Sequence, residues 1–303
     1  SMAQDDTMNE DEKVLRAPFE YIRSMPGKQI RIAWAKKTEN CLNVFISSTV
    51  ILSEIVEMLH NASLLIDDIE DGSVLRRGLP VTHSIFGDAR TINSANYIYF
   101  VALEACIKLD HPKAIETFTR NILELHRGQG KEIYWRDTVI PPTIDQYEKM
   151  VIQKTGGLFN LAVQLMQLFS KCTLDMHELL ELMAVYFQIR DDLLNLCSPD
   201  MAKQKTAAED LTEGKFSYPI ILALENSKGN DDQVLNILRQ RTKDVEVKMY
   251  CVDIMRQRGV FKETRNRLDE LSLKIRNRVN DMGGNERVIG VLDLLEKAVV
   301  LIE

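Results

Sequence analysis

The feature that most constrains the fold of this 303-residue chain is a long apolar segment that ends in three aspartates. Apolar residues recur with a helical period from about Phe45 to Ile69, and the segment closes with Asp67-Asp68-Ile69-Glu70-Asp71. The next residues, Gly72-Ser73, are typical of the positions just past a helix C-terminus. Periodicity of this length predicts a long helix rather than a strand.

The three aspartates of this segment predict a cation site. On a helix Asp67 and Asp71 lie one above the other, Asp68 lies beside them, and His60 falls on the same stripe. Carboxylates at a helix C-terminus repel one another and the negative end of the dipole, and a hard cation removes that repulsion. Oxygen ligands without a Cys/His cluster indicate Mg²⁺ rather than zinc. A solvated acidic helix end remains an alternative for this stretch alone.

A second acidic stretch repeats the first. Asp191-Asp192-Leu193-Leu194-Asn195 follows an apolar run from Leu179 to Ile189. Gln188 precedes Asp191, Asp192 and Asn195 by three, four and seven residues, so the four side chains share a helical face. Two matching acidic faces on apolar helices are hard to explain by solvation. They indicate opposite walls of a cavity that holds metal ions and a polyanion.

Helical periodicity extends over nearly the whole chain, and apolar and polar residues do not alternate convincingly over strand length. No composition shift divides the chain, so we expect one all-α domain over 14–303 and a disordered acidic tail over 1–13. The expected helices are Glu12–Met25, Gln29–Lys36, Asn43–Glu70, Arg90–Leu109, Pro112–Arg136, Thr143–Ser170, Asp175–Cys197, Pro219–Glu225, Asp231–Gln240, Val245–Gln257, Phe261–Asp281 and one from Glu286.

Charge and cysteine usage narrow the class of protein. The net charge of −7 argues against a nucleic-acid surface, so any basic residues that bind an anion must act locally. The five cysteines are scattered and odd in number, which favours free thiols in a reducing compartment. The chain has no run of 18 apolar residues and no signal-peptide pattern, so we expect a cytoplasmic protein without a transmembrane segment.

Basic residues occur where a phosphate could bind. Lys28 and Arg31 follow a Pro-Gly turn at an expected helix N-terminus, and Arg76-Arg77 follow the first acidic stretch. A helix N-terminus suits phosphate, and guanidinium can grip the oxygens that Mg²⁺ also holds. The alternatives, surface cations and an aspartate–arginine ion-pair network, remain open.

Two further segments carry cations. Lys154-Thr155 precede Gly156-Gly157 inside an expected helix, where glycine is unfavourable and indicates close packing or a kink. The stretch from Ser198 to Tyr218 lacks periodicity and is typical of a lid, from which Lys205 and Lys215 could reach a polyanion. A tight helix crossing and a solvated loop are the corresponding alternatives.

Together these residues resemble the trans-isoprenyl diphosphate synthases. The shared motifs occur in the family's order: Gly27-Lys28, the first acidic stretch with Arg76-Arg77, Lys154-Thr155, Phe187-Gln188 before Asp191-Asp192, and Gly214-Lys215-Phe216-Ser217. The sequences Glu57–Asp71 and Glu209–Ser217 are most similar to the geranylgeranyl diphosphate synthases of animals and fungi. Asn195 departs from the general family pattern, which has aspartate there.

The resemblance implies an isoprenoid-synthase-type helical bundle around a central cavity. It implies transfer of an allylic group, with farnesyl diphosphate as the expected donor, to isopentenyl diphosphate, with two or three Mg²⁺ ions per site and a homodimer or an assembly of dimers. The implied metal ligands are Asp67, Asp68, Asp71, Asp191, Asp192 and Asn195. Isopentenyl diphosphate would contact Lys28, Arg31, His60 and Arg77, and the allylic diphosphate would contact Arg76, Lys154, Thr155, Gln188, Lys205 and Lys215.

Product length depends on side chains one turn before the first acidic stretch. The resemblance implies that small residues there, Ala62 and Ser63, leave room for a product longer than C15. It places the floor at Tyr99, Phe100 and His126, for which an ordinary structural role is an equal alternative. Farnesyl diphosphate synthase and a weakly catalytic subunit of a heteromeric synthase are the other functions considered. A terpene cyclase is disfavoured, because it binds one diphosphate rather than two.

Overall fold

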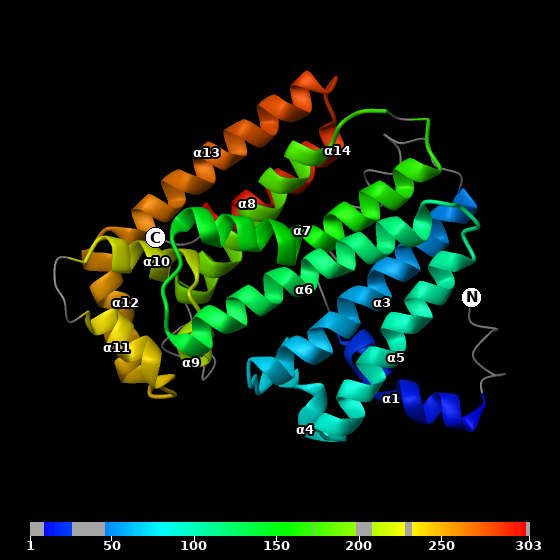
Figure 1. Cartoon of the computed structure of the whole chain (residues 1–303). Coiled ribbons are helices and arrows are strands. Elements are labelled where there is room, and N and C mark those ends of the chain that lie inside the picture. Colours follow the sequence, from blue (N-terminus) through cyan, green and yellow to red (C-terminus); the bar gives the residue numbers. More distant parts are fainter. Residues whose placement is uncertain (1–8, 26–45, 172, 198–207, 228–231, 301–303) are drawn as a thin grey trace. The chain divides into compact units, whose positions relative to one another are not determined.

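The computed structural model describes residues 9–25, 46–171, 173–197, 208–227 and 232–300 (Figure 1). The regular elements of the described residues are helices, apart from one hairpin of two-residue strands, which confirms the all-α fold class. The expected helix at Gln29–Lys36 lies outside these residues. The elements are α1 Glu10–Ser24, α3 Ile46–Glu70, β1 Leu75–Arg76, β2 Leu79–Pro80, α4 Thr82–Phe86, α5 Asp88–Ile107, α6 Ala114–Thr138, α7 Ile144–Leu168, α8 His177–Cys197, α9 Glu209–Glu213, α10 Tyr218–Glu225, α11 Gln233–Gln240, α12 Val245–Gln257, α13 Val260–Asp281 and α14 Glu286–Val300.

The chain divides into two compact units. Unit 1 comprises Ser1–Thr119 with Leu161–Lys171, and unit 2 comprises Arg120–Asn160 with Cys172–Glu303. Both α6 and α7 contribute residues to each unit. Because the division falls inside two continuous helices, no linker of distinctive composition separates the two units. The sequence therefore shows no sign of the division.

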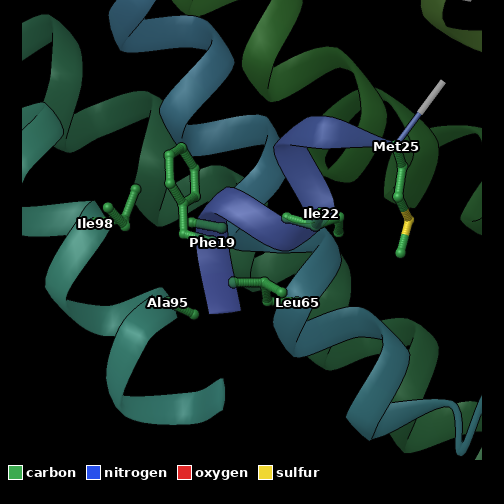
Figure 2. Packing of buried hydrophobic residues seen from close by; sticks show 7 residues of the cluster. Phe19, Ile22, Met25, Leu65, Ala95 and Ile98 are labelled. Atoms are coloured by element: carbon green, nitrogen blue, oxygen red, sulfur yellow. The ribbon is translucent and has the colours of Figure 1, made fainter. Parts of the chain in front are cut away.

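The core of unit 1 forms between α1, α3 and α5 (Figure 2). Phe19 and Ile22 of α1 pack with Leu65 of α3 and Ile98 of α5, and these four side chains are almost fully buried. Contacts of this kind, rather than helix propensity alone, stabilise a helix of 15 residues in water.

The N-terminal helix begins earlier than expected. The side chain of Asn9 accepts a hydrogen bond from the backbone N–H of Asp11, and α1 starts at Glu10. Three acidic residues in its first turn interact favourably with the positive end of the helix dipole. Residues 10–13 are therefore helical, although the acidic composition had suggested a disordered tail up to residue 13.

The core of unit 2 includes the packing of α8 against α13. Buried apolar residues of α8, among them Tyr186, Ile189 and Leu193, recur at the helical spacing that the sequence predicted. The same period appears in α13 at Leu268, Leu271 and Ile275. No helix in the described part of the chain is both long enough and apolar enough to cross a membrane.

Three short elements were not predicted. They are the hairpin of β1 and β2, helix α4, and helix α9, which lies inside the stretch expected to be a continuous loop. The two helices are shorter than two turns, and each strand has only two residues. Segments this short show no recognisable hydrophobic period in the sequence. The hairpin turns at Arg77 and Gly78, whose φ angles are 54° and 81°.

Candidate active site

The first acidic stretch lies at the C-terminus of α3 in unit 1. The N–H of Gly72 donates to the carbonyl of Ile69 at 3.2 Å, and the N–H of Ser73 donates to the carbonyl of Asp68 at 3.0 Å. Gly72 has a φ of 63°, a left-handed conformation that favours glycine. This geometry confirms the predicted helix end, and it places Asp67 and Asp68 in the last turn with Asp71 just beyond it.

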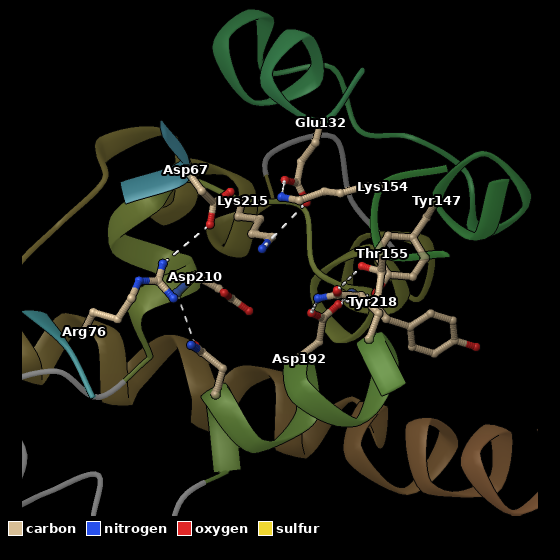
Figure 3. A network of polar contacts seen from close by, with 12 residues as sticks. Asp67, Arg76, Glu132, Tyr147, Lys154, Thr155, Asp192, Asp210, Lys215 and Tyr218 are labelled. Carbon is tan, nitrogen blue, oxygen red and sulfur yellow. Dashed lines mark hydrogen bonds and ion pairs between the residues drawn. The ribbon is translucent and has the colours of Figure 1, made fainter. Parts of the chain in front are cut away.

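Asp68, which is buried, forms an ion pair with the partly exposed Arg76 of β1. Arg76 Nε and Nη2 lie 2.7 and 2.6 Å from Asp68 Oδ1. Arg76 Nη2 also lies 3.6 Å from Asp67 Oδ2 (Figure 3). The side chain of Asp68 is 1% exposed, and its Oδ2 has no hydrogen-bond partner among the described residues. Burial raises the pKa of the Asp68 carboxyl, although Arg76 acts in the opposite direction. A bound cation would satisfy a buried acceptor that has no donor.

Arg77 reaches the end of α1. Its Nη1 donates to the carbonyl of Met25 at 3.3 Å, and Met25 lies three positions before Lys28 in the sequence. Burial and the neighbouring Arg76 lower the pKa of Arg77, so an anion would compensate its charge. Lys28, Arg31 and Lys205 lie outside the described residues.

The residues expected to set product length have different environments. Ala62 is fully buried in the α1–α3–α5 core, and Tyr99 packs against that cluster. Ser63 is half-buried, and its hydroxyl donates to the carbonyl of His60 at 2.8 Å. Burial raises the pKa of Tyr99, and the nearby carboxylates of Glu70 and Asp67 add to the shift.

Phe100 and His126 are exposed. Phe100 on α5 is 71% exposed and so is not a core aromatic. Its expected place at the floor that limits product length stays a prediction. A helix buries one face, and Phe100 falls on the other. His126 is exposed on α6 in unit 2, with Nδ1 2.9 Å from the carbonyl of Ile122.

The second acidic stretch lies on α8 in unit 2, and its two aspartates differ. Asp192 is 2% exposed, and its Oδ2 accepts from the hydroxyl of Tyr147 at 2.5 Å and from the N–H of Tyr218 at 2.8 Å. Its Oδ1 accepts from Gln188 Nε2 at 2.9 Å. The side chain of Asp191 is 51% exposed and lies 3.1 Å from Arg190 Nη1. Asp192 therefore caps the N-terminus of α10, whereas Asp191 faces solvent.

Other predicted residues join this network. Thr155 of α7 donates its hydroxyl to Gln188 Oε1 at 2.8 Å, so Gln188 links Thr155 to Asp192. Asn195 Oδ1 accepts from the backbone N–H of Asp210 at 3.2 Å. In this conformation the oxygen of Asn195 holds the start of α9.

Lys154 and Lys215 both pair with Glu132 of α6. Lys154 Nζ donates to Glu132 Oε2, and Lys215 Nζ lies 3.7 Å from Glu132 Oε1 (Figure 3). Burial acts to lower the pKa of Lys215, but Glu132, Asp210 and other carboxylates outweigh it and raise the pKa well above its usual value.

Glycines bring the helices of unit 2 together around these side chains. A Cβ on Gly157 would lie 3.3 Å from Leu125 Cβ, and a Cβ on Gly156 would lie 3.4 Å from Ala184 Cβ. A Cβ on Gly128 would lie 2.5 Å from the backbone nitrogen of Lys154, a distance that real Cβ atoms do not reach. Close helix packing thus explains the glycines of α7. The approach is closer still at Gly128 of α6, which was not predicted from the sequence.

Four polar residues of this network belong to none of the predicted sites. They are Glu132, Tyr147, Asp210 and Tyr218. Tyr147 lies among apolar residues at core spacing, and Tyr218 contributes a backbone N–H, so neither carries a sequence signal. Glu132 is a charged residue at a buried position of α6. Charged residues are seldom buried without a partner, so its position could have drawn attention.

The donor set fits Mg²⁺. No group of three or more His, Cys, Asp or Glu side chains in the described residues is arranged to hold a metal ion. The carboxylates of Asp67, Asp68 and Asp71 nevertheless supply the oxygen ligands that Mg²⁺ prefers. The buried Oδ2 of Asp68 is an acceptor that a cation would satisfy.

An all-α fold with two acidic helix segments, each with arginine or lysine side chains nearby, defines a protein suited to metal-assisted chemistry on a polyanion. Residues 12–255 match the model of the family described as polyprenyl synthetase. The chain belongs to this family, whose members use Mg²⁺.

Relatives cover most of the chain and carry two kinds of name. A terpene synthase of Matsumurasca onukii is 52% identical over 286 residues, which are 94% of this chain and 94% of that protein. A geranylgeranyl pyrophosphate synthase of Hypoxylon pulicicidum is 47% identical over 95% of this chain and 75% of its own. Another of Aspergillus flavus is 48% identical over 94% of this chain and 84% of its own.

Proposed function

We propose that this member of the polyprenyl synthetase family is a geranylgeranyl diphosphate synthase. It would join isopentenyl diphosphate to farnesyl diphosphate and release pyrophosphate. The observation that carries the proposal is the ion pair of buried Asp68 with Arg76, beside Asp67, in which one acceptor oxygen of Asp68 has no donor among the described residues. Such a pair can hold a metal ion and a phosphate together. The names of the fungal relatives support the product.

The carboxylates would hold two or three Mg²⁺ ions on the allylic diphosphate. Mg²⁺ supplies stabilisation of the negative charge that builds on the leaving oxygens. Asp67, Asp68 and Asp71 are the proposed ligands in unit 1, and the accessible Asp191 is the proposed ligand in unit 2. The bonds of Asp192 and Asn195 support positioning roles for both side chains in place of the metal ligation implied by resemblance.

Cationic and polar side chains would bind the two substrates. Arg76, Lys154, Lys205 and Lys215 are assigned to the allylic diphosphate, with Thr155 and Gln188 near the reacting carbons. Lys28, Arg31, His60 and Arg77 are assigned to the diphosphate of isopentenyl diphosphate. The bond from Arg77 to the carbonyl of Met25 supports this second group, since Lys28 follows Met25 so closely.

The reaction follows from these assignments. The carbon–oxygen bond of the allylic diphosphate breaks, the double bond of isopentenyl diphosphate attacks the resulting cation, and a proton is then lost. We assign the proton to the released pyrophosphate, as the resemblance to the family implies. Buried surroundings would protect the cation from water.

A terpene synthase is the second candidate, because the relative from M. onukii carries that name at 52% identity. Such an enzyme would ionise one diphosphate and release a product without phosphate. Incubation with geranyl, farnesyl or geranylgeranyl diphosphate alone, without isopentenyl diphosphate, separates the two. A volatile product under these conditions favours the second candidate, whereas recovery of the starting diphosphate favours the first.

Substitution of Asp67 tests the metal assignment. Asp67→Ala should lower turnover about 10²-fold or more, the scale of losing one stabiliser of the transition state. The measurement is incorporation of labelled isopentenyl diphosphate at saturating Mg²⁺. Turnover near that of the unsubstituted protein would remove Asp67 from the metal site.

A further inference from the structure

Glu132 of α6, which no motif of the sequence analysis included, contacts two of the proposed diphosphate-binding lysines. Lys154 Nζ donates to its Oε2, and Lys215 Nζ lies 3.7 Å from its Oε1. The side chain of Glu132 is 11% exposed, and those of Lys154 and Lys215 are 19% and 17% exposed. One nearly buried carboxylate thus pairs two ammonium groups that come from different elements (Figure 3).

Backbone packing holds this arrangement in place. Gly128 lies one turn before Glu132 on α6, and its missing side chain lets the backbone of α7 approach at Lys154. Lys215 is held through its own N–H, which donates to the carbonyl of Asp210 at 2.9 Å. The N–H of Asp210 in turn donates to Asn195 of α8. Both lysines therefore approach Glu132 from fixed backbone positions.

A negative group close to the two lysines stabilises the cluster. Two ammonium groups with little solvent around them repel each other, and burial favours loss of a proton from each. Burial alone would lower the pKa of Lys215, but Glu132 and the other nearby carboxylates raise it instead. With Glu132 in place, Lys215 stays charged before any substrate arrives.

We infer that Glu132 is a positioning residue that substitutes for the substrate's diphosphate between turnovers. It keeps Lys154 and Lys215 together, aimed at the place that the diphosphate will occupy, so the site is preorganised. Its charge remains when a diphosphate binds, and it therefore opposes retention of the product pyrophosphate. This inference rests on the proposed function, from which the roles of the two lysines derive.

Glu132→Gln tests the inference, because it keeps the shape of the side chain and removes the charge. The inhibition constant of inorganic pyrophosphate with Mg²⁺ should fall about tenfold, the scale expected of one repulsive charge removed from a partly buried site. The kcat should fall by a similar factor, about tenfold, because the lysines lose their preorganised positions. Loss of a merely structural glutamate would not make pyrophosphate bind more tightly while turnover becomes slower.

Two matched variants accompany the test. Glu124→Gln removes a carboxylate from the same helix two turns earlier, where Glu124 contacts Arg127 and Gln153 instead, and it should leave the inhibition constant unchanged. Glu132→Asp keeps the charge and should restore pyrophosphate binding to within about twofold of the original.

The inhibition constant of pyrophosphate decides against the inference as well as for it. An inhibition constant that is unchanged or higher in Glu132→Gln overturns the inference. If that variant does not fold, the double variant Glu132→Gln/Lys154→Gln is compared with Lys154→Gln. A lower constant in the double variant supports the inference, and an equal or higher one overturns it. An unsubstituted protein that neither condenses substrates nor binds pyrophosphate overturns the proposed function as well.

Discussion

At the scale of single residues, the two aspartates of Asp191-Asp192 have separate environments. Asp192 accepts three hydrogen bonds from α7, α8 and the start of α10, whereas Asp191 is half exposed beside Arg190. Their adjacency in sequence suggested a shared role as metal ligands. Neighbours on a helix point about 100° apart, so one of them can be buried while the other faces solvent.

The pair of variants Asp191→Asn and Asp192→Asn separates these roles. Asp192→Asn replaces one acceptor oxygen with an NH2 group. Depending on the orientation of the amide, either Tyr147 and Tyr218 or Gln188 loses its acceptor, which should reduce the free energy of unfolding by about 1–3 kcal/mol without metal. Asp191→Asn should leave that free energy nearly unchanged and raise the Mg²⁺ concentration needed for half-maximal turnover. Denaturant unfolding in EDTA and Mg²⁺ titration are the two measurements. Equal stability of both variants would contradict the assignment.

Positions 62 and 63 also differ in whether they can accept a larger side chain. Ala62→Phe inserts a ring into the packed α1–α3–α5 core and should lower stability by about 1–3 kcal/mol. Ser63→Phe changes a half-buried position and should shorten the product from C20 to C15 with less effect on stability. Thermal unfolding and product chromatography check the two effects. A C20 product from a stable Ser63→Phe variant would count against the chain-length role of Ser63.

At the scale of elements, the long helices were predictable from the sequence, whereas the short elements and the contacts between elements were not. Periodicity located α3, α5, α6, α7, α8 and α13, because each buries one face over many turns. The hairpin that carries Arg76, and α9 before Lys215, are too short to show a period. The acidic and basic residues of the candidate site were identifiable from spacing. Their hydrogen bonds to Glu132, Tyr147 and Tyr218 were not, because these contacts join elements far apart in sequence.

Gly128 of α6 tests the importance of close helix packing at Lys154. Gly128→Ala forces a Cβ against the backbone of Lys154, which should cost about 1–3 kcal/mol of stability and displace that lysine. Gly130→Ala, two residues along the same helix, meets nothing within 4 Å and should be neutral or stabilising by about 1 kcal/mol. Thermal unfolding and steady-state kinetics compare the two variants. Equal stabilities would show that α7 moves aside without penalty.

At the scale of the whole molecule, the match to the polyprenyl synthetase family covers residues of both units. The proposed function assigns roles to Asp67, Asp68 and Arg76 of unit 1 and to Asp191, Lys154 and Lys215 of unit 2. The proposal requires that both groups act on one reaction. Loss of either acidic segment should therefore abolish the same product.

The most direct test of this account is the identity of the product. Purified protein receives labelled isopentenyl diphosphate with dimethylallyl, geranyl or farnesyl diphosphate, in the presence of Mg²⁺ or EDTA. The account predicts a C20 diphosphate that forms from farnesyl diphosphate and disappears with EDTA. Accumulation of a C15 diphosphate would contradict the proposed product length, and the absence of condensation with every starter would contradict the prenyl-transfer function itself.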